Sequence, residues 1–320
     1  MKLFVTGGAG FIGSNYVRFV LGSSDDSVTV FDALTYAGNL DNLRGLDDDP
    51  RFAFVKGDIT DRDAVRSAID GHDAVLHFAA ESHVDRSIVS PDEFVHTNCD
   101  GTNVMCDIAR RVGVGRFLHV STDEVYGSIE EGSFSETDTL GPRSPYSASK
   151  AASDVIALSY HSTYGLPVVV TRSSNNFGPY QFPEKVIPLF VTNLLEGERV
   201  PLYGDGLNVR DWCYVEDNCA GIDRVLRAGS EGEIYNIGAG NEVTNREVTD
   251  AILGILGHDD SMIEYVDDRL GHDRRYSIAT DKVRALGWDT KREFREALEG
   301  TVTWYRDNRW WWEPLKQRDA

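Results

Sequence analysis

Short apolar runs alternate with longer mixed segments through the first half of the chain. Runs such as Leu3–Thr6 and Ala74–Ala79 are apolar at nearly every position, which is typical of strands that helices cover on both faces. The pattern predicts six such strands, at residues 3–6, 28–32, 52–58, 74–79, 117–122 and 167–173. It predicts helices at residues 11–21, 92–111 and 146–164. This alternation indicates an α/β fold built on a doubly wound parallel sheet.

The pattern loosens after Ser173, where prolines and glycines interrupt the chain between residues 175 and 203. We expect one helix in that stretch, a strand at residues 234–237 and a helix at residues 293–306. We therefore divide the chain into a sheet domain, residues 1–173, and a smaller C-terminal α/β domain, residues 174–320. Whether residues 211–245 return to the first domain stays open at this point.

A glycine-rich segment, Gly7–Gly13, joins the first predicted strand to the first predicted helix. Its glycines at positions 7, 10 and 13 allow a tight turn and close approach of a phosphate, and the amides that open the helix can bind a pyrophosphate. Asp32 ends the second strand, where a carboxylate accepts hydrogen bonds from an adenosine ribose and repels a 2′-phosphate. The sequence thus predicts a Rossmann domain that binds NAD rather than NADP. Asp58-Ile59 could meet the adenine edge, or Asp58 could simply cap its strand.

The composition narrows the possible partners. The 320 residues carry a formal net charge of −20, and so acidic a surface repels nucleic acid. No apolar run approaches the roughly 20 residues that span a bilayer, and the chain opens on a strand rather than a signal peptide. No His or Cys spacing suits a metal, and Cys99 and Cys106 lie too far apart on one predicted helix for a disulfide. We therefore expect a cytoplasmic protein with reduced thiols, without a metal and without nucleic-acid or membrane partners.

Tyr146 and Lys150 lie four residues apart on a predicted helix, so their side chains share one face of it. An ammonium, together with a positive nicotinamide, lowers the pKa of a phenol, which lets the tyrosine take a hydroxyl proton while hydride leaves the same carbon. Thr122 ends the preceding strand, at the sheet edge where doubly wound folds bind ligands. A surface Tyr and Lys on an ordinary helix is the alternative, but the upstream glycine loop and Thr122 favour catalysis.

Asp123 and Glu124 follow Thr122 directly. Once a sugar carbon has become a ketone, the neighbouring C–H is acidified. One carboxyl group can then remove that proton while another protonates a β-hydroxyl, which leaves as water. Two carboxyl groups in different environments can divide those roles. A charged turn at the strand end is the alternative, but beside Tyr146 the pair predicts oxidation and elimination in one site.

Several segments carry a family resemblance. Gly7–Gly13, Tyr146 and Lys150 are similar to the extended short-chain dehydrogenases/reductases. More narrowly, the chain resembles the dTDP-glucose 4,6-dehydratase family in five segments, at residues 34–40, 79–87, 121–127, 174–185 and 271–276. Thr122-Asp123-Glu124 is the specific part, since the related 4-epimerases lack the acidic pair.

The resemblance implies a reaction with a role for each catalytic residue. Tyr146, supported by Lys150, would take the proton of the glucose 4-hydroxyl as hydride passes to NAD⁺, and Thr122 would hydrogen-bond that oxygen. Glu124 would abstract the C5 proton, and Asp123 would protonate the C6 hydroxyl as water leaves. Hydride would return to C6, giving the 4-keto-6-deoxy sugar. NAD would thus be regenerated in each turnover and stay tightly bound.

The resemblance also implies binding residues in both domains. The implied contacts of NAD, in domain 1–173, are Gly7, Gly10, Phe11, Ile12, Gly13, Asp32, Leu34, Thr35, Asp58, Ile59, Ala79, Ala80, Thr97, Tyr146 and Lys150. The implied contacts of the nucleotide sugar, mostly in domain 174–320, are His83, Thr122, Asn175, Glu184, Lys185, Pro201, Tyr203, Arg210, Asn245, Arg269 and His272. Arg210 and Arg269 suit a diphosphate, although a solitary arginine is by itself more typical of a surface ion pair.

Two features concern packing rather than chemistry. In the resembled family, helices 92–111 and 146–164 pair with their copies in a second subunit, which implies a homodimer. Trp304, Trp310, Trp311 and Trp312 are expected to pack the last helix and the tail against the core rather than to bind a ligand.

Two other functions remain as alternatives. A nucleotide-sugar 4-epimerase or decarboxylase would share NAD and the Tyr/Lys pair but would not need adjacent carboxyl groups. A non-catalytic dinucleotide sensor would typically have lost Tyr146 or Lys150, and both are present.

Overall fold

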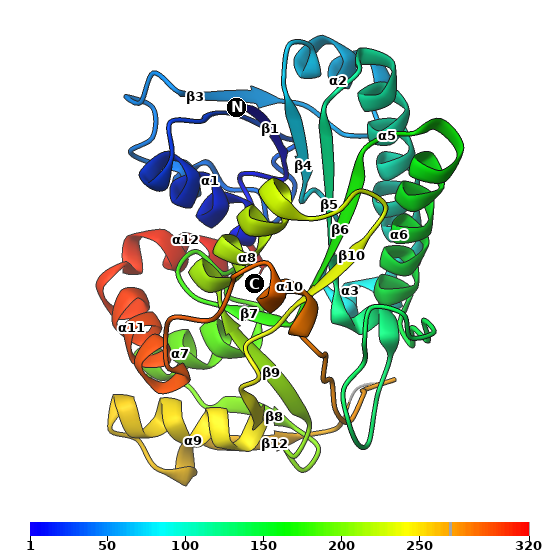
Figure 1. Ribbon diagram of the computed structural model, residues 1–320. Helices are drawn as coiled ribbons and strands as arrows, with labels where there is room; N and C mark the ends of the chain where they lie inside the picture. The colour runs from blue at the N-terminus through cyan, green and yellow to red at the C-terminus, as the bar shows by residue number, and fades with distance from the viewer. Residues whose placement is uncertain (269–270, 320) are drawn as a thin grey trace.

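A parallel sheet forms the frame of the molecule. The structure is a computed structural model that describes residues 1–268 and 271–319. Seven strands pair in the order β10-β6-β5-β4-β1-β2-β3, every pair parallel (Figure 1). In that order they are β10 (Ile234–Ile237), β6 (Val168–Ser173), β5 (Arg116–Thr122), β4 (Ala74–His77), β1 (Lys2–Thr6), β2 (Ser27–Asp32) and β3 (Phe52–Lys56). The predicted doubly wound parallel sheet is thus confirmed.

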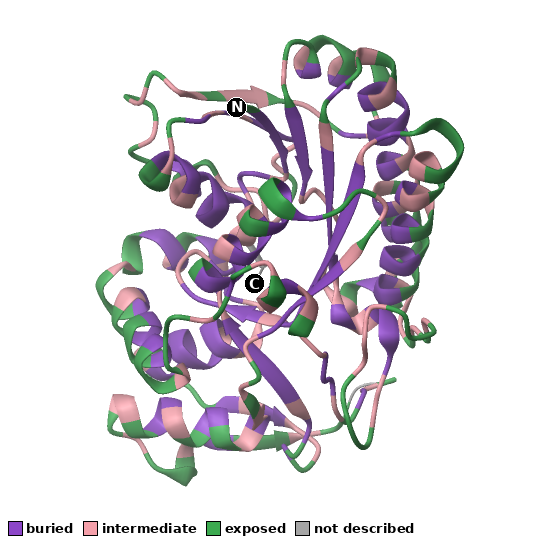
Figure 2. Ribbon diagram, viewed as in Figure 1, coloured by how far each residue is buried: buried purple, intermediate pink, exposed green. Residues whose placement is uncertain are grey.

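Helices cover both faces of this sheet, because its strands carry apolar side chains on both. On β1, Leu3 and Val5 belong to the core under one helix layer and Phe4 to the core under the other. The first layer holds α1 (Phe11–Ser23) and α8 (Val215–Ala228). The second holds α2 (Arg62–Ile69), α5 (Gly101–Val112) and α6 (Pro145–Tyr164). Figure 2 shows the buried strands between helices that expose only their outer faces.

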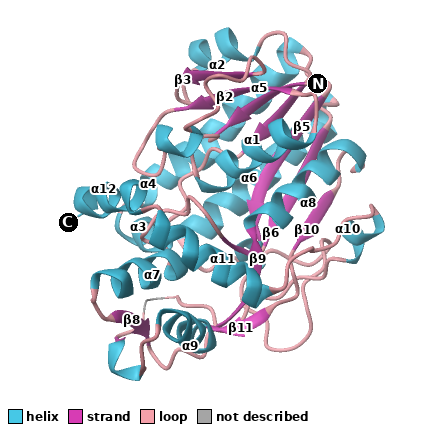
Figure 3. Cartoon of the chain, turned by 90° about the vertical axis from the view of Figure 1, so that its left-hand side faces the viewer, coloured by secondary structure: helices cyan, strands magenta, loops and turns pink. Residues whose placement is uncertain are grey.

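A second lobe lies beyond the C-terminal ends of the sheet strands and has its own core (Figure 3). Its strands form a three-stranded sheet, of β7 (Asn175–Phe177), β9 (Val209–Tyr214) and β11 (Glu242–Thr244), and a parallel pair, of β8 (Val200–Tyr203) and β12 (Ile263–Val266). Its helices are α7 (Val186–Glu196), α9 (Asn245–Leu256), α11 (Phe294–Asp307) and α12 (Arg309–Asp319). Trp311 and Trp312 of α12 are buried in this core, whereas Trp310 is exposed.

The predicted helix at residues 92–111 is not one regular helix. Its first part is the short α4 (Pro91–Phe94) and a π-helical turn (Val95–Asp100), and only then does α5 begin. The π turn buries Asn98, whose amide binds the backbone of Glu81 through both its oxygen, at 2.8 Å, and its nitrogen, at 3.0 Å. π turns are frequent at functional sites, and a residue pattern alone does not reveal them.

The remaining short elements lie in loops and at strand ends. They are α3 (Val84–Val89), α10 (Asp281–Ala285) and the 3₁₀ turns Leu40–Leu43, Asp123–Tyr126 and Asp260–Met262. Sequence periodicity did not predict α3, which is too short to show a repeat. The predicted strands 52–58 and 74–79 end two residues early, because Gly57 and Phe78 already lie in the loops at the sheet edge.

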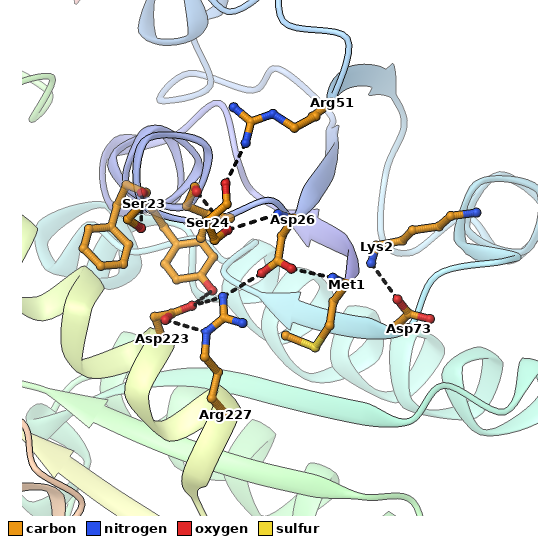
Figure 4. A network of polar contacts seen from close by, with 12 residues as sticks. Met1, Lys2, Ser23, Ser24, Asp26, Arg51, Asp73, Asp223 and Arg227 are labelled. Atoms are coloured by element: carbon orange, nitrogen blue, oxygen red, sulfur yellow. Dashed lines mark hydrogen bonds and ion pairs between the residues drawn. The ribbon is translucent and has the colours of Figure 1, made fainter.

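Residues 211–245 contribute to both parts of the fold. β10 is the outer strand of the large sheet, and α8 packs on α1, whereas β9 and β11 belong to the second lobe. A polar network ties α8 to the start of the chain (Figure 4). Arg227 contacts Asp26 at 2.6 Å and Asp223 at 2.7 Å, and the N-terminal amine of Met1 contacts the same Asp26. The domain division at residue 173 stays a prediction.

Three further properties bear on the possible functions. None of the helices in the described part of the chain combines the length and the apolar character that crossing a bilayer requires. Within residues 1–268 and 271–319, no group of three or more His, Cys, Asp or Glu side chains could hold a metal ion. All four cysteines lie among these residues and are free thiols.

Candidate active site

Two adjoining cavities lie between the large sheet and the second lobe. The first opens at the C-terminal ends of β1, β2 and β5, where parallel sheets bind ligands. The second is lined by α7, by β7, β8 and β9, by the start of α9 and by loop residues such as Glu184 and Tyr276. Gln181, Glu184 and Lys185 line both, so the two cavities meet there.

The glycine loop has the geometry of a pyrophosphate cradle. Gly7 has φ +68°, and a Cβ there would lie 2.5 Å from the backbone nitrogen of Ala79. A Cβ at Gly13 would clash with the carbonyl oxygen of Gly7. Helix α1 starts after Gly10, and no side chain of the described residues caps its first amides. Those amides are therefore available to an anion at the positive end of the helix dipole, as NAD binding requires.

Gly13→Ala should weaken NAD binding strongly, since the new methyl group pushes the loop away from the helix at a cost of about 1–3 kcal/mol. Gly22→Ala is the matched control, because it lies on the same helix with open space around its added Cβ. Calorimetric titration with NAD measures both variants. Equal affinities in the two would show that the close packing at Gly13 does not matter for the cofactor.

Asp32 lies at the end of β2 and is 8% exposed. Its Oδ2 accepts a hydrogen bond from the Ala9 amide at 2.9 Å, and its Oδ1 accepts one from Leu34 at 2.8 Å. Burial raises the pKa of this carboxyl, and the two backbone hydrogen bonds oppose that rise. Each oxygen keeps a second lone pair, so the group can still accept from a ribose while it holds the loop.

Most predicted cofactor residues line the first cavity. They are Gly7, Gly10, Phe11, Ile12, Gly13, Asp32, Thr35, Asp58, Ile59, Ala79, Ala80, Thr97, Tyr146 and Lys150. Leu34 is not among the lining residues and instead supports Asp32, from a backbone with φ +56°. Asp58 Oδ1 accepts from the amide and the hydroxyl of Thr60, both at 2.8 Å, so Asp58 caps the strand end and lines the cavity as well.

Tyr146 and Lys150 face the first cavity from α6. Ser144 caps that helix in a reciprocal arrangement with Ser147, and Pro145 opens it, which fixes Tyr146 in the first turn. Lys150 Nζ donates to the carbonyl oxygen of Val120, on β5, at 2.8 Å. Burial lowers the pKa of Lys150 to about 8, although Asp154 acts in the opposite direction.

The pKa of Tyr146 is raised in this structure. Burial is the largest cause, and the negative charges of Glu124 and Asp123 add to it, whereas a hydrogen bond with Thr122 lowers the pKa. These causes come from protein groups alone, so the lowering of this pKa by Lys150 together with a positive nicotinamide stays a prediction. The same effects place Thr122, Asp123, Glu124 and Tyr146 in one electrostatic neighbourhood, as predicted from their spacing.

Asp123 and Glu124 occupy unlike environments although they are adjacent. Asp123 is 3% exposed, and its pKa is raised well above the usual value by burial and then by Glu124. Its Oδ1 accepts from the Thr122 hydroxyl at 3.2 Å, while its buried Oδ2 has no hydrogen-bond partner among the described residues. Glu124 lines the second cavity. The pair thus presents a buried carboxyl group with a raised pKa beside a carboxyl group that reaches the ligand space.

The predicted sugar-binding residues gather around the second cavity. Those that line it are His83, Asn175, Glu184, Lys185, Pro201, Tyr203, Arg210, Asn245 and His272. Thr122 is not among the residues that line either cavity, although Ser121 lines the first and Glu124 the second. Arg269 lies outside the described residues. Arg210 is 5% exposed and stacks over the Tyr276 ring at 4.2 Å, so it is not the surface arginine that its sequence alone would suggest.

Several residues at the two cavities were not predicted. Tyr276 lines the second cavity, and its hydroxyl donates to Asp273 at 2.7 Å. Tyr36 lines the first cavity, and its hydroxyl donates to Glu184 at 3.2 Å. Both lie in segments that carry the family resemblance, which was the available signal. Trp311 also lines the first cavity, and nothing near it in the sequence indicated that.

Comparison with known proteins identifies relatives of the kind that the sequence resemblance implies. The family model for GDP-mannose 4,6-dehydratase matches residues 4–301. A dTDP-glucose 4,6-dehydratase from Streptomyces antibioticus is 57% identical over 327 residues, which cover 100% of this chain and 97% of the relative. The solved dTDP-glucose 4,6-dehydratase DesIV from Streptomyces venezuelae, with NAD and a second ligand bound, has a TM-score of 0.97 and 55% identity over 98% of this chain and 100% of its own.

A more distant neighbour shares the fold. The UDP-glucose 4-epimerase of Thermus thermophilus, solved with NAD, has a TM-score of 0.89 and 33% identity over 96% of this chain and 100% of its own. The resemblance seen in the sequence is confirmed, and the chain belongs to the GDP-mannose 4,6-dehydratase family.

Proposed function

We propose that this chain is an NAD-dependent dTDP-glucose 4,6-dehydratase, a hydro-lyase that produces dTDP-4-keto-6-deoxyglucose. Full-length relatives of that name are 53% and 57% identical to it. The observation that carries the proposal is the buried acid Asp123 beside Glu124 and Tyr146. An epimerase needs the tyrosine but has no use for an adjacent acid and base.

Oxidation at C4 would use the groups at the end of β5 and the start of α6. NAD, when bound, supplies the redox chemistry by accepting a hydride from the sugar and returning it within the same cycle. Tyr146 would take the proton of the 4-hydroxyl, and Thr122 would hold the same oxygen. Lys150 would supply a positive charge that is fixed by its bond to the Val120 carbonyl.

Elimination would follow from the acidified C5–H bond of the 4-keto sugar. Glu124 would take the C5 proton, and Asp123 would donate its own proton to the C6 hydroxyl, so that one water leaves. The raised pKa of Asp123 suits this role, because it favours the protonated form that a general acid needs. Hydride returns to C6 and a proton to C5, so the sugar loses one water overall and the cofactor ends unchanged.

A product assay tests the proposal directly. Incubation with dTDP-glucose should give a 4-keto-6-deoxy sugar, which develops ultraviolet absorbance in alkali. Parallel incubations with UDP-glucose and GDP-glucose compare the nucleotide bases, which the lining residues do not distinguish. If only dTDP-galactose forms, the chain is an epimerase and the proposal fails.

The rate constant kcat/KM should fall as pH rises through about 8, where Lys150 loses its charge. The direction follows from the lowered pKa, since the charged form that assists Tyr146 exists only below it. Lys150→Arg keeps its charge throughout this range, so that variant should not show the fall even if it is slower. Rates measured across pH in both proteins check this. A fall that persists unchanged in Lys150→Arg would belong to another group.

We also propose a homodimer formed through α5, α6 and the segments around them, as the family resemblance implies. Large apolar side chains are exposed along this part of the molecule. They are Ile88 and Val89 on α3, Val95 in the π turn, and Val155 and Tyr164 on α6. Val89 is 83% exposed and Val155 59%, and burying such side chains against a second copy would stabilise the pair.

Val155→Glu should turn the dimer into a monomer, because it would place a charge inside the proposed interface. Leu207→Glu is the control, since Leu207 is similarly exposed, at 46%, but lies in the second lobe. Light scattering coupled to size-exclusion chromatography gives the mass of each variant. A monomeric wild-type protein, or a Val155→Glu protein that still dimerises, would contradict this interface.

A further inference from the structure

The C-terminal helix α12 reaches the cofactor cavity through one tryptophan. Trp311 is 2% exposed and lines that cavity together with residues of the glycine loop. Its neighbour Trp312 is fully buried but turns to α11, where its Nε1 donates to the carbonyl oxygen of Tyr305 at 2.8 Å. The last helix therefore has one tryptophan on the cofactor side and one within the second lobe.

Trp311 begins a chain of buried hydrogen bonds that ends at the carboxyl group predicted to hold the ribose. Its Nε1 donates to Asn42 Oδ1 at 2.7 Å, and Asn42 Nδ2 donates to the carbonyl oxygen of Ala9 at 2.8 Å. The amide of Ala9 then donates to Asp32 Oδ2 at 2.9 Å. Asn42 is 1% exposed and Ala9 0%, so water cannot readily replace these bonds.

These hydrogen bonds add to the backbone bonds that hold the glycine loop, such as the one that the Asn39 amide donates to the same Ala9 carbonyl oxygen at 3.0 Å. Ala9 lies among glycines, whose backbones have the widest conformational freedom, and the loop must hold its amides still to bind a pyrophosphate. Asn42 is itself held, because Arg18 of α1 donates to its carbonyl oxygen at 2.8 Å. Trp311 and Asn42 thus connect the glycine loop to α12 and, through Arg18, to the body of α1.

We propose that Trp311 and Asn42 form a relay through which helix α12 holds the glycine loop in its NAD-binding conformation. This proposal depends on the NAD site of the proposed function. It adds that a helix outside the predicted nucleotide-binding domain helps to keep NAD bound. Both side chains line the cofactor cavity, and in the relay they act on NAD as positioning residues, through Ala9.

Trp311→Phe keeps most of the ring but removes the N–H, which leaves Asn42 Oδ1 buried without its donor. We expect NAD to bind roughly tenfold more weakly, the loss typical of one buried hydrogen bond. Trp312→Phe is the matched control, since it removes an equivalent buried N–H bond in the same helix without touching Asn42. It should lower the melting temperature but leave the NAD dissociation constant unchanged. Titration of each cofactor-stripped protein with NAD measures the constants.

Asn42→Ala distinguishes the relay from a direct contact between Trp311 and the cofactor. In the Asn42→Ala background, Trp311→Phe should weaken NAD binding no further, because the link is already cut. Additive losses would overturn the relay, and so would equal NAD affinities in wild type and Trp311→Phe. If Trp311→Phe does not fold, Asn42→Ala alone must lower the affinity for the relay to hold. A wild-type protein that does not bind NAD would instead refute the proposed function.

Discussion

Tyr146→Phe is expected to reduce conversion of dTDP-glucose by about 10³–10⁴-fold, towards the upper end of what general acid–base catalysis contributes. The variant keeps the buried ring, which packs edge-on against Phe94 with 6.3 Å between the ring centroids, and loses only the hydroxyl. Oxidation at C4 precedes every later step. The variant should therefore show neither product nor reduced cofactor when it is mixed with substrate.

Two measurements separate this chemical effect from damage to the fold. The melting temperature should stay close to wild type and NAD should still bind, since Thr122 is the side chain that hydrogen-bonds the lost hydroxyl and the other cofactor contacts remain. Thr122→Val removes the same hydrogen bond by deleting the threonine hydroxyl. It should reduce turnover less than Tyr146→Phe does, because Tyr146 can still take the proton. Turnover by Tyr146→Phe at the wild-type rate would remove this residue from the mechanism.

The sequence predicts those parts of the site where only a few residue types can occupy a position and the reason lies in the neighbouring residues. Gly7 and Gly13 show this, because no larger residue fits against Ala79 or the loop itself. The strands were predictable for the same reason, since burial on both faces leaves a continuous apolar run. Asp123 and Glu124 are adjacent, so one short segment showed both carboxyl groups of the proposed elimination.

Features that depend on contacts between distant segments were not predictable. The Trp311–Asn42 hydrogen bond joins residues 269 positions apart, so neither side of it marks the other in the sequence. The pKa of Tyr146 also depends on burial and on the charge of Glu124, which helix spacing from Lys150 does not show. In the π turn, the side chain of Asn98 bonds to the backbone of Glu81, a contact between separate segments that no pattern of neighbouring residues indicates.

Asp123→Asn and Glu124→Gln should each suppress loss of water by about 10²–10⁴-fold while cofactor reduction by the substrate survives. Both substitutions preserve the size of the side chain and remove only its proton transfer. Asparagine in particular resembles the protonated carboxyl group that burial favours at position 123, but it cannot give up a proton to the departing hydroxyl. Absorbance of the reduced nicotinamide should therefore rise and persist in both variants. A variant that loses hydride transfer as completely as water loss would contradict separate roles for these residues.

Hydrogen exchange at C5 then tells the two carboxyl groups apart. In deuterated water, Asp123→Asn should still exchange the C5 hydrogen of the bound 4-keto sugar, because Glu124 can remove and return that proton without elimination. Glu124→Gln should show no such exchange, since it lacks the base. The raised pKa of Asp123 and the place of Glu124 on the second cavity support the proposed acid role of the first and the proposed base role of the second. Exchange that is lost in Asp123→Asn and kept in Glu124→Gln would reverse the two roles while leaving the reaction intact.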